Sequence, residues 1–186
     1  GTVAGPDEFH VERFLCAHTI MMALEGIPAL YLHSFLGAEN DMQLLGKTGR
    51  NRSINRGRFD LRELERNLDD IDSSMHRVFY GLQEVLSVRQ RQTAFHPNAT
   101  QYTLHLGEGL FSFWRQSRSR SQSIFCVHNI SDREKEFSLD QLNLIETDEW
   151  FDLLSARSFP NLKAKLSLRP YQCLWLTNGR SLGNGS

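Results

Sequence analysis

The feature that most constrains the fold is an apolar run of strand length, IPALYLHSFLG, at residues 27–37. Apolar residues fall on both faces of this run, which is typical of an interior strand of a parallel sheet. Gly26 and Pro28 separate the run from the residues before it, and Gly37 closes it. One parallel strand cannot form a sheet alone, so its neighbours must come from elsewhere. We therefore interpret the first half of the chain as the last part of a larger α/β domain.

Helical patterns flank this run. The segment PDE at residues 6–8 marks a helix start, because Pro suits a first turn and acidic groups favour the positive end of the dipole. Gly26 ends that helix. A short helix is predicted after Asp60, which has a Glu at capping-box spacing, and a stronger one from about residue 74 to residue 90. The polar stretch 38–60, which lies between the apolar run and these two helices, is predicted to be a long loop.

From about residue 100 the sequence is typical of antiparallel β structure. Strands are predicted at residues 101–107, 110–117, 123–130, 149–155 and 167–178. This spacing predicts a sandwich of about 80 residues. We expect Trp114 and Trp175 to lie in its core rather than to serve as sugar-stacking platforms.

Composition and charge argue against nucleic-acid binding, a metal site and disulfide bonds. The chain has 186 residues and a formal net charge of −1, which argues against a dedicated nucleic-acid binder. The segment RQSRSRSQS at residues 115–123 resembles RNA-binding tracts, but it lacks interleaved aromatic residues, so a solvated hairpin loop is expected. No metal site is expected, because the three cysteines lack ligand spacing. We interpret Cys16, Cys126 and Cys173 as reduced, buried thiols rather than as disulfide partners, which suits a cytoplasmic protein.

Neither targeting nor membrane insertion is expected. The segment GTVAGPDEF at residues 1–9 has no basic region followed by an apolar core, so no signal peptide is predicted. The apolar-rich segment 14–36 is interrupted by His18, Glu25, Gly26 and Pro28, so it is not predicted to span a membrane.

Specific strings in the sequence resemble a known family. The segment GIPALYLHSFLG is followed by AENDMQLLGKTGRNRSINR, then by FHPNA at residues 95–99, and the β region closes with LRPYQCLWL. Together they resemble the end of the catalytic barrel and the C-terminal domain in the sucrose-phosphorylase-like branch of the α-amylase clan. Ser53 stands where sucrose phosphorylases usually have Asp, and this form is more similar to glucosylglycerate phosphorylases.

The resemblance implies an α+β fold class: the last helix–strand–helix part of a (β/α)8 TIM barrel, followed by an antiparallel β-sandwich C-terminal domain. The implied domains are residues 1–95 for the end of the barrel and 96–180 for the sandwich, with a flexible tail at 181–186. Residues 29–33 would form the eighth strand of the barrel, and residues 37–56 the loop after it.

The resemblance also implies the chemistry of the whole enzyme. In such a retaining double displacement, an Asp attacks the anomeric carbon, a Glu protonates the leaving group, and phosphate then accepts the glucosyl unit. The clan carries these carboxylates on earlier strands, whose motifs are absent from this sequence. We therefore assign no catalytic residue and expect no cofactor. Sugar and inorganic phosphate are the partners implied for the full-length enzyme.

Four arginines lie in TGRNRSINRGRFD at residues 48–60, in the loop where a barrel performs its chemistry. Arg52 and Arg56 can offer forked donors to phosphate or to an acceptor carboxylate, and Arg50 and Arg58 are expected to contribute less. Asn55 would hold the loop or bond a hydroxyl. The alternative is that the arginines pair with barrel carboxylates and only hold the loop in place.

Three further candidates precede the arginines. Asn40 and Asp41 can contact substrate or cap the loop through an Asx turn. His33 would end the strand and point into the pocket, or pack as a structural histidine.

For the full-length enzyme, an α-glucoside hydrolase of the same clan is the alternative to a phosphorylase. A second class of function also stays open at this point. The β domain could be a non-catalytic module that binds carbohydrate or a partner protein. On its own, the chain is expected to self-associate through the apolar surface and strand edges of residues 27–33.

Overall fold

The computed structural model describes residues 7–55, 57–142, 149–161 and 163–178. The chain forms two compact units: Gly1–Pro28 joins Glu84–Ser186 in the first, and Ala29–Gln83 makes up the second. The predicted domains divide the chain differently, because they refer to a whole barrel enzyme, and they stay a prediction.

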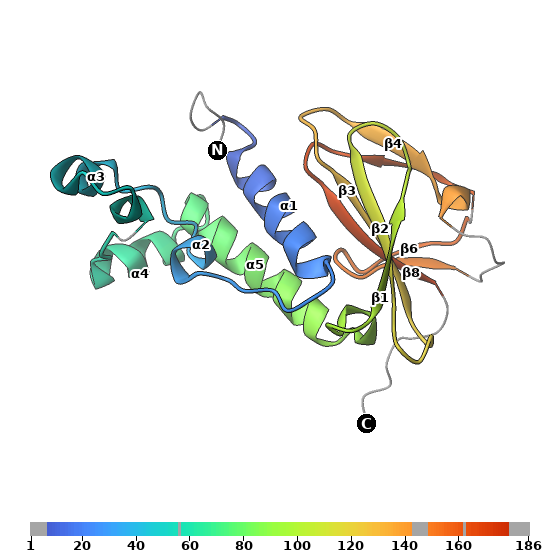
Figure 1. The fold of residues 1–186 in the computed structure, drawn as a ribbon. Coiled ribbons are helices and arrows are strands. Elements are labelled where there is room, and N and C mark those ends of the chain that lie inside the picture. Colours follow the sequence, from blue (N-terminus) through green and yellow to red (C-terminus); the bar gives the residue numbers. More distant parts are fainter. Residues whose placement is uncertain (1–6, 56, 143–148, 162, 179–186) are drawn as a thin grey trace. The chain divides into compact units, whose positions relative to one another are not determined.

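The first unit contains a six-stranded antiparallel sheet with strand order β1-β2-β3-β8-β5-β6 (Figure 1). Its strands are β1 (Thr100–Leu104), β2 (Leu110–Gln116), β3 (Ser123–Asn129), β8 (Cys173–Asn178), β5 (Trp150–Asp152) and β6 (Arg157–Phe159). A second, two-stranded sheet pairs β4 (Lys135–Ser138) with β7 (Lys165–Leu168). The helices of this unit are α1 (His10–Ala23), the end of α5 (Ser74–Gln90), and the 3-10 turns η2 (Thr93–Phe95) and η3 (Leu139–Gln141).

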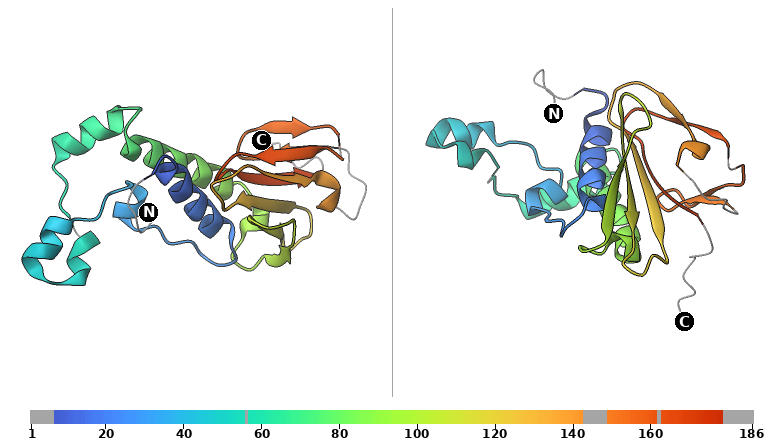
Figure 2. Two further views of the ribbon diagram at one scale, coloured as in Figure 1. Left: turned by 90° about the horizontal axis from the view of Figure 1, so that it is seen from above. Right: turned by 45° about the vertical axis from the view of Figure 1, so that its right-hand side comes forward.

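The six-stranded sheet is covered on both faces. Phe125 and Val127 of β3 point into a core shared with β4, β7 and η3, while Ile124 and Cys126 point into a core shared with α1, α5 and η2. Alternate residues of a strand face opposite sides, so a strand buried on both sides is apolar at nearly every position. The views of Figures 1 and 2 agree that α1 runs along one face of the sheet.

These two layers confirm the predicted antiparallel sandwich and the α+β fold class. Two strands, β4 and β6, were not predicted. The predicted strand 167–178 is wrong, because it divides into β7 and β8, which lie in different sheets. Between them, Pro170 has no backbone N–H to donate, and Tyr171 adopts φ 57° in the left-handed region. The chain therefore turns there and changes sheet.

The second unit is largely helical. It contains α2 (Leu32–Phe35), α3 (Met42–Thr48), the 3-10 turn η1 (Asn51–Asn55), α4 (Leu61–Asp69) and the first part of α5. The predicted helix after Asp60 is confirmed, and Asp60 caps it by accepting a hydrogen bond from the backbone N–H of Glu63 at 3.1 Å. Gly37 adopts φ 61°, and a Cβ there would approach the Cβ of Val78 to 2.9 Å. Glycine at this position thus lets the end of α2 approach α5 closely.

The predicted interior strand at residues 29–33 does not form in this chain. Residues 27–31 are extended without strand pairing, and α2 begins at Leu32. Ile27 is 83% exposed, and Tyr31 and Leu32 are also exposed. A strand of this kind forms only where neighbours satisfy its backbone groups, and the described residues supply none. The stretch predicted as a loop, residues 38–60, in turn contains α3 and η1.

Within the described residues, none of the helices combines the length and the apolar character that a membrane span would need.

Arg115 is fully buried in β2, so its prediction as part of a solvated hairpin loop is wrong. Its Nη1 donates to the carbonyl of Ala23 at 2.9 Å, and its Nη2 donates to the carbonyls of His96 at 2.9 Å and Ala99 at 3.4 Å. Residues 118–121 do form an exposed hairpin turn. The strand preceding that turn thus contributes a buried cation that holds the end of α1.

We predict that Arg115→Met lowers the free energy of unfolding of this unit by about 2–4 kcal/mol, because it leaves buried carbonyls without donors. All three tryptophans lie in the sheet unit, so their fluorescence during urea unfolding reports on this unit alone. Arg118→Met, in the exposed turn, is the matched control and should change stability by less than about 0.5 kcal/mol. Equal effects of the two substitutions would contradict the structural role of Arg115.

His128 is a second buried titratable group, in β3. Its Nδ1–H donates to the carbonyl of Phe111 at 2.9 Å, while its Nε2 has no hydrogen-bond partner among the described residues. Burial lowers the pKa of His128 from its ordinary 6.5 to about 4. The imidazole is therefore held in the neutral Nδ1–H form.

This shift predicts a loss of stability in acid. The unfolded chain binds a proton near pH 6.5 and the folded chain only near pH 4, so stability falls as the pH is lowered between these values. Between pH 7.5 and pH 4.5, the protein should lose about 2 kcal/mol more than a His128→Asn variant does. The exposed His105 provides the control, since His105→Asn should keep the acid sensitivity of the wild type. Parallel stability curves for wild type and His128→Asn would contradict the account.

Candidate functional site

A cavity of about 480 Å3 lies within the second unit. It is bordered by the segments that connect α2 to α3 and η1 to α4, together with α4 and the start of α5. Two of the predicted site residues, His33 and Asp41, line it. Arg52 and Asn40 do not, so the cavity gathers only part of the predicted set.

His33 is held firmly at the cavity. It lies in α2 rather than at the end of a strand, and its Nε2–H donates to the carbonyl of Gly57 at 2.8 Å. Its ring stacks on Tyr31 with centroids 5.0 Å apart and contacts Phe59 at 4.9 Å. Its Nδ1 is buried and has no hydrogen-bond partner among the described residues. Because Nε2 carries the proton, Nδ1 is a hydrogen-bond acceptor.

Asp41 joins three segments of this unit. Its Oδ1 accepts a hydrogen bond from the N–H of Leu44 at 2.7 Å, which caps the start of α3, and its own N–H donates to the carbonyl of Ile54 at 2.6 Å. A Cβ on Gly57 would approach its Oδ2 to 3.4 Å. Asp41 therefore has a capping role, as in the Asx-turn alternative. Asn40, directly before it, is exposed.

The arginines of this stretch differ in position. Arg52 is exposed on η1, and Arg58 is exposed at the cavity. Arg56 lies outside the described residues, and of Asn55 only the backbone, at the end of η1, is described. Arg50, Arg52 and Arg58 form no ion pair with any residue that the structure describes. Their guanidinium groups are therefore not used to hold this loop within the described chain.

Arg58, which was expected to contribute less than Arg52 and Arg56, lies at the rim of the cavity. It reaches the cavity because Gly57 binds His33 through its carbonyl, which fixes the following residue at the rim. Carboxylates of Glu39, Asp60 and Glu63 also line the cavity. The site thus presents a cation and several carboxylates, a mixture suited to a polyhydroxylated ligand. No grouping of His, Cys, Asp and Glu suited to a metal ion occurs among the residues that the structure describes.

Comparison with known proteins gives the family. The chain is 30% identical over 190 residues to the glucosylglycerate phosphorylase of Spirochaeta thermophila, covering 95% of this chain and 32% of that enzyme. It is 33% identical over 171 residues to the glucosylglycerate phosphorylase of Allomeiothermus silvanus, covering 91% of this chain and 28% of that enzyme. The chain corresponds to the C-terminal part of a sucrose-phosphorylase-like enzyme of the α-amylase clan.

The solved structures agree at the level of the fold. An AmyP variant in complex with maltotriose superposes with a TM-score of 0.73 at 14% identity, over 92% of this chain and 35% of AmyP. No family model matches the chain. It spans about a third of the length of the curated relatives that it matches.

Proposed function

We propose that this chain is the C-terminal portion of a retaining α-glucoside phosphorylase. In that enzyme it contributes the loop after the eighth strand of a TIM barrel and the β domain that follows. The similarity of nearly the whole chain to about a third of two glucosylglycerate phosphorylases carries this proposal. Inorganic phosphate and an α-glucoside are the partners of the full-length enzyme.

The chain's own contribution is binding rather than bond breaking. Retaining enzymes of this kind use one carboxylate as nucleophile and another as acid, and the matched part of the chain holds neither. His33 borders the cavity, and Arg52 and Arg58 can donate paired hydrogen bonds to an oxyanion. Such contacts orient the glucoside or the phosphate for the carboxylates of the barrel.

Two observations favour glucosylglycerate over sucrose as the α-glucoside. The resemblance implies Asp in sucrose phosphorylases at the position that Ser53 occupies here. The relatives matched over more than 90% of the chain are glucosylglycerate phosphorylases, whereas a sucrose phosphorylase is matched over 76%. The glycerate group carries a carboxylate, for which an arginine is a suitable partner.

No observation favours the alternative of a separate carbohydrate-binding module. Trp150 and Trp175 are buried, and Trp114 stacks on Phe125 at 5.6 Å. The tryptophans of the β domain therefore pack in its cores and do not form an exposed platform for sugar.

The proposal predicts that the longer polypeptide carrying this sequence at its end releases glucose 1-phosphate from glucosylglycerate and phosphate. This chain alone should release none, because the two carboxylates are missing. Release of free glucose at the same rate with and without phosphate would show a hydrolase and contradict the proposal.

The arginines are tested in that longer polypeptide. Arg52→Lys and Arg58→Lys keep the charge but remove the forked donor, so each should raise the Michaelis constant for phosphate or for the glycosyl acceptor about tenfold. Arg118→Lys, in the exposed turn of the β domain, should leave both constants unchanged. If both loop variants keep wild-type constants and lose only thermal stability, the arginines serve the loop rather than the ligand.

A further inference from the structure

The sheet unit contains a second cavity, of about 440 Å3, next to α1. Cys16 and Thr19 of α1 line one side, and Tyr171 and Cys173 line the other. The two cysteines are 157 positions apart in sequence yet share this cavity. The third cysteine, Cys126, is fully buried in the core beneath α1 and does not line the cavity.

The two thiols border the same cavity. The Cys16 Sγ–H lies 3.6 Å from the carbonyl oxygen of Asn129, and the Cys173 Sγ–H lies 3.9 Å from the carbonyl oxygen of Tyr171. Asn129 in turn donates its N–H to the carbonyl of Gln172, directly before Cys173, so the two cysteines flank one point of the sheet. Cys16 is buried, whereas Cys173 is partly exposed. A reagent in the cavity therefore meets two cysteines rather than one.

Hydrogen bonds from β3 hold the turn that precedes Cys173. Asn129 of β3 donates its N–H to the carbonyl of Gln172 at 2.9 Å, and its Nδ2 donates to the carbonyl of Arg169 at 2.9 Å. The turn before β8 is thereby bound to the sheet. The position of Cys173 beside the cavity is therefore set by the sheet.

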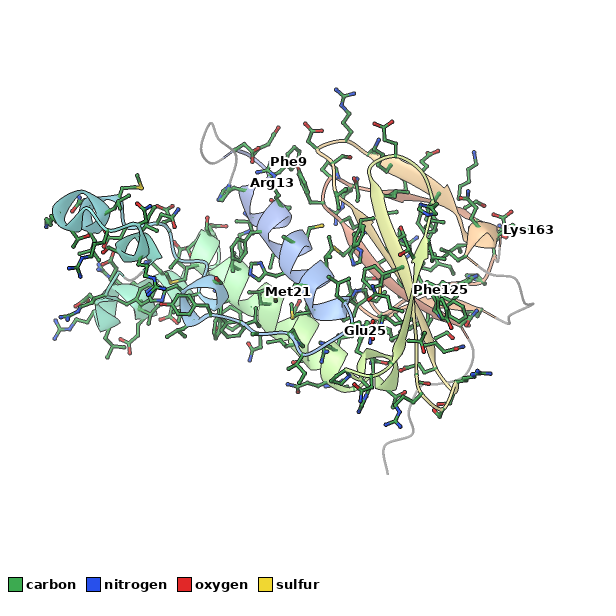
Figure 3. The ribbon with its side chains drawn as sticks, in the orientation of Figure 1. Phe9, Arg13, Met21, Glu25, Phe125 and Lys163 are labelled. Atoms are coloured by element: carbon green, nitrogen blue, oxygen red, sulfur yellow. The ribbon has the colours of Figure 1, made fainter. Side chains whose placement is uncertain are left out.

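The N-terminal end of α1 is held against the same turn. The guanidinium of Arg13 lies over the ring of Tyr171 at 4.8 Å, and Phe9 contacts that ring at 5.9 Å. Figure 3 shows Phe9 and Arg13 at the N-terminal end of α1. Arg13 also forms an ion pair with Asp7 at 2.5 Å. The cavity is therefore bounded by ordered aromatic and charged contacts as well as by the two thiols.

We propose that Cys16 and Cys173 form a redox modification site, at which hydrogen peroxide closes a reversible disulfide between α1 and β8. The Cys16 thiolate attacks the peroxide, the O–O bond breaks, and one water leaves after protonation, with Cys16 as the sulfenic acid. The Cys173 sulfur then attacks the Cys16 sulfur, the S–O bond breaks, and a second water leaves. Two thiols are oxidised and one peroxide is reduced, and a dithiol reverses the reaction.

The chemistry of the pair suits this order of steps. The hydrogen bond from Cys173 lowers the pKa of Cys16, and the thiolate is the form that reacts with peroxide. The resulting bond joins two distant residues of the sheet unit. A cross-link over so long a segment restricts the unfolded chain strongly, so oxidation should raise the melting temperature of this unit.

The test treats this chain with hydrogen peroxide, blocks remaining thiols with iodoacetamide, and digests the product with trypsin. The three cysteines fall in separate tryptic peptides, 14–47, 121–133 and 166–180. We expect the first and last to be linked in the monomer, a mass loss of about 2 Da for the intact chain, and alkylation of the middle peptide. Dithiothreitol should reverse the mass change and the rise in melting temperature.

Variants separate this pair from other thiol chemistry. Cys173→Ser and Cys16→Ser should each abolish the linked peptide and the stabilisation, while Cys126→Ser should keep both. Cys173 is partly exposed, so its substitution tests the proposal even if Cys16→Ser fails to fold. Overoxidised but unlinked peptides, a link that involves Cys126, or a link found only between two chains would overturn the proposal.

Discussion

The structure of the sheet unit depends on the hydrogen bonds that the last carbonyl groups of α1 accept. The last carbonyls of this helix are negative, and its last turn contains no basic residue. Two arginines from elsewhere bind them: the Arg89 Nε donates to the carbonyl of Met22 at 2.6 Å, and the buried Arg115 donates to the carbonyl of Ala23. Burial lowers the pKa of Arg115, yet three carbonyls, those of Ala23 at the end of α1 and of His96 and Ala99 after η2, hold its charge inside. The helix, the end of α5 and the sheet are joined at this one place.

The two units differ in how many apolar residues they bury by themselves. The sheet unit buries apolar residues on both faces of its strands, and α1 alone contributes five buried residues. In the other unit, α2, α3 and α4 contribute no buried residue, and Ala29–Gln83 places its polar groups around a cavity. Under our proposal this difference has a functional meaning, since the second unit presents ligand-binding groups and depends on the rest of a barrel for its apolar contacts.

Local signals in the sequence predicted local structure well. The apolar stripe of α5, the cap at Asp60 and the strands β2 and β3 follow from periodicity and hydrogen-bond chemistry within a few residues. The strand expected at residues 29–33 does not form, because its stability rests on neighbours that the described chain lacks. The burial of Arg115 was not predicted, because the polar residues 117–121 that follow it are typical of a solvent-exposed turn. Its hydrogen-bond partner, the carbonyl of Ala23, lies 92 positions away in the sequence. In the candidate site, the cap at Asp41 was foreseen, but the approach of Arg58 depends on the contact between His33 and Gly57.

The central claim is that residues 29–60 are completed by the preceding part of a longer enzyme, whereas the sheet unit is already complete. Hydrogen exchange of backbone amides tests it directly, by comparing this chain alone with the same residues in the full-length parent. We predict that amides of residues 29–60 exchange quickly in the chain alone and become strongly protected in the parent. Amides of β3 and β8 should be equally protected in both. Equal protection of residues 29–60 in the two proteins would contradict the account.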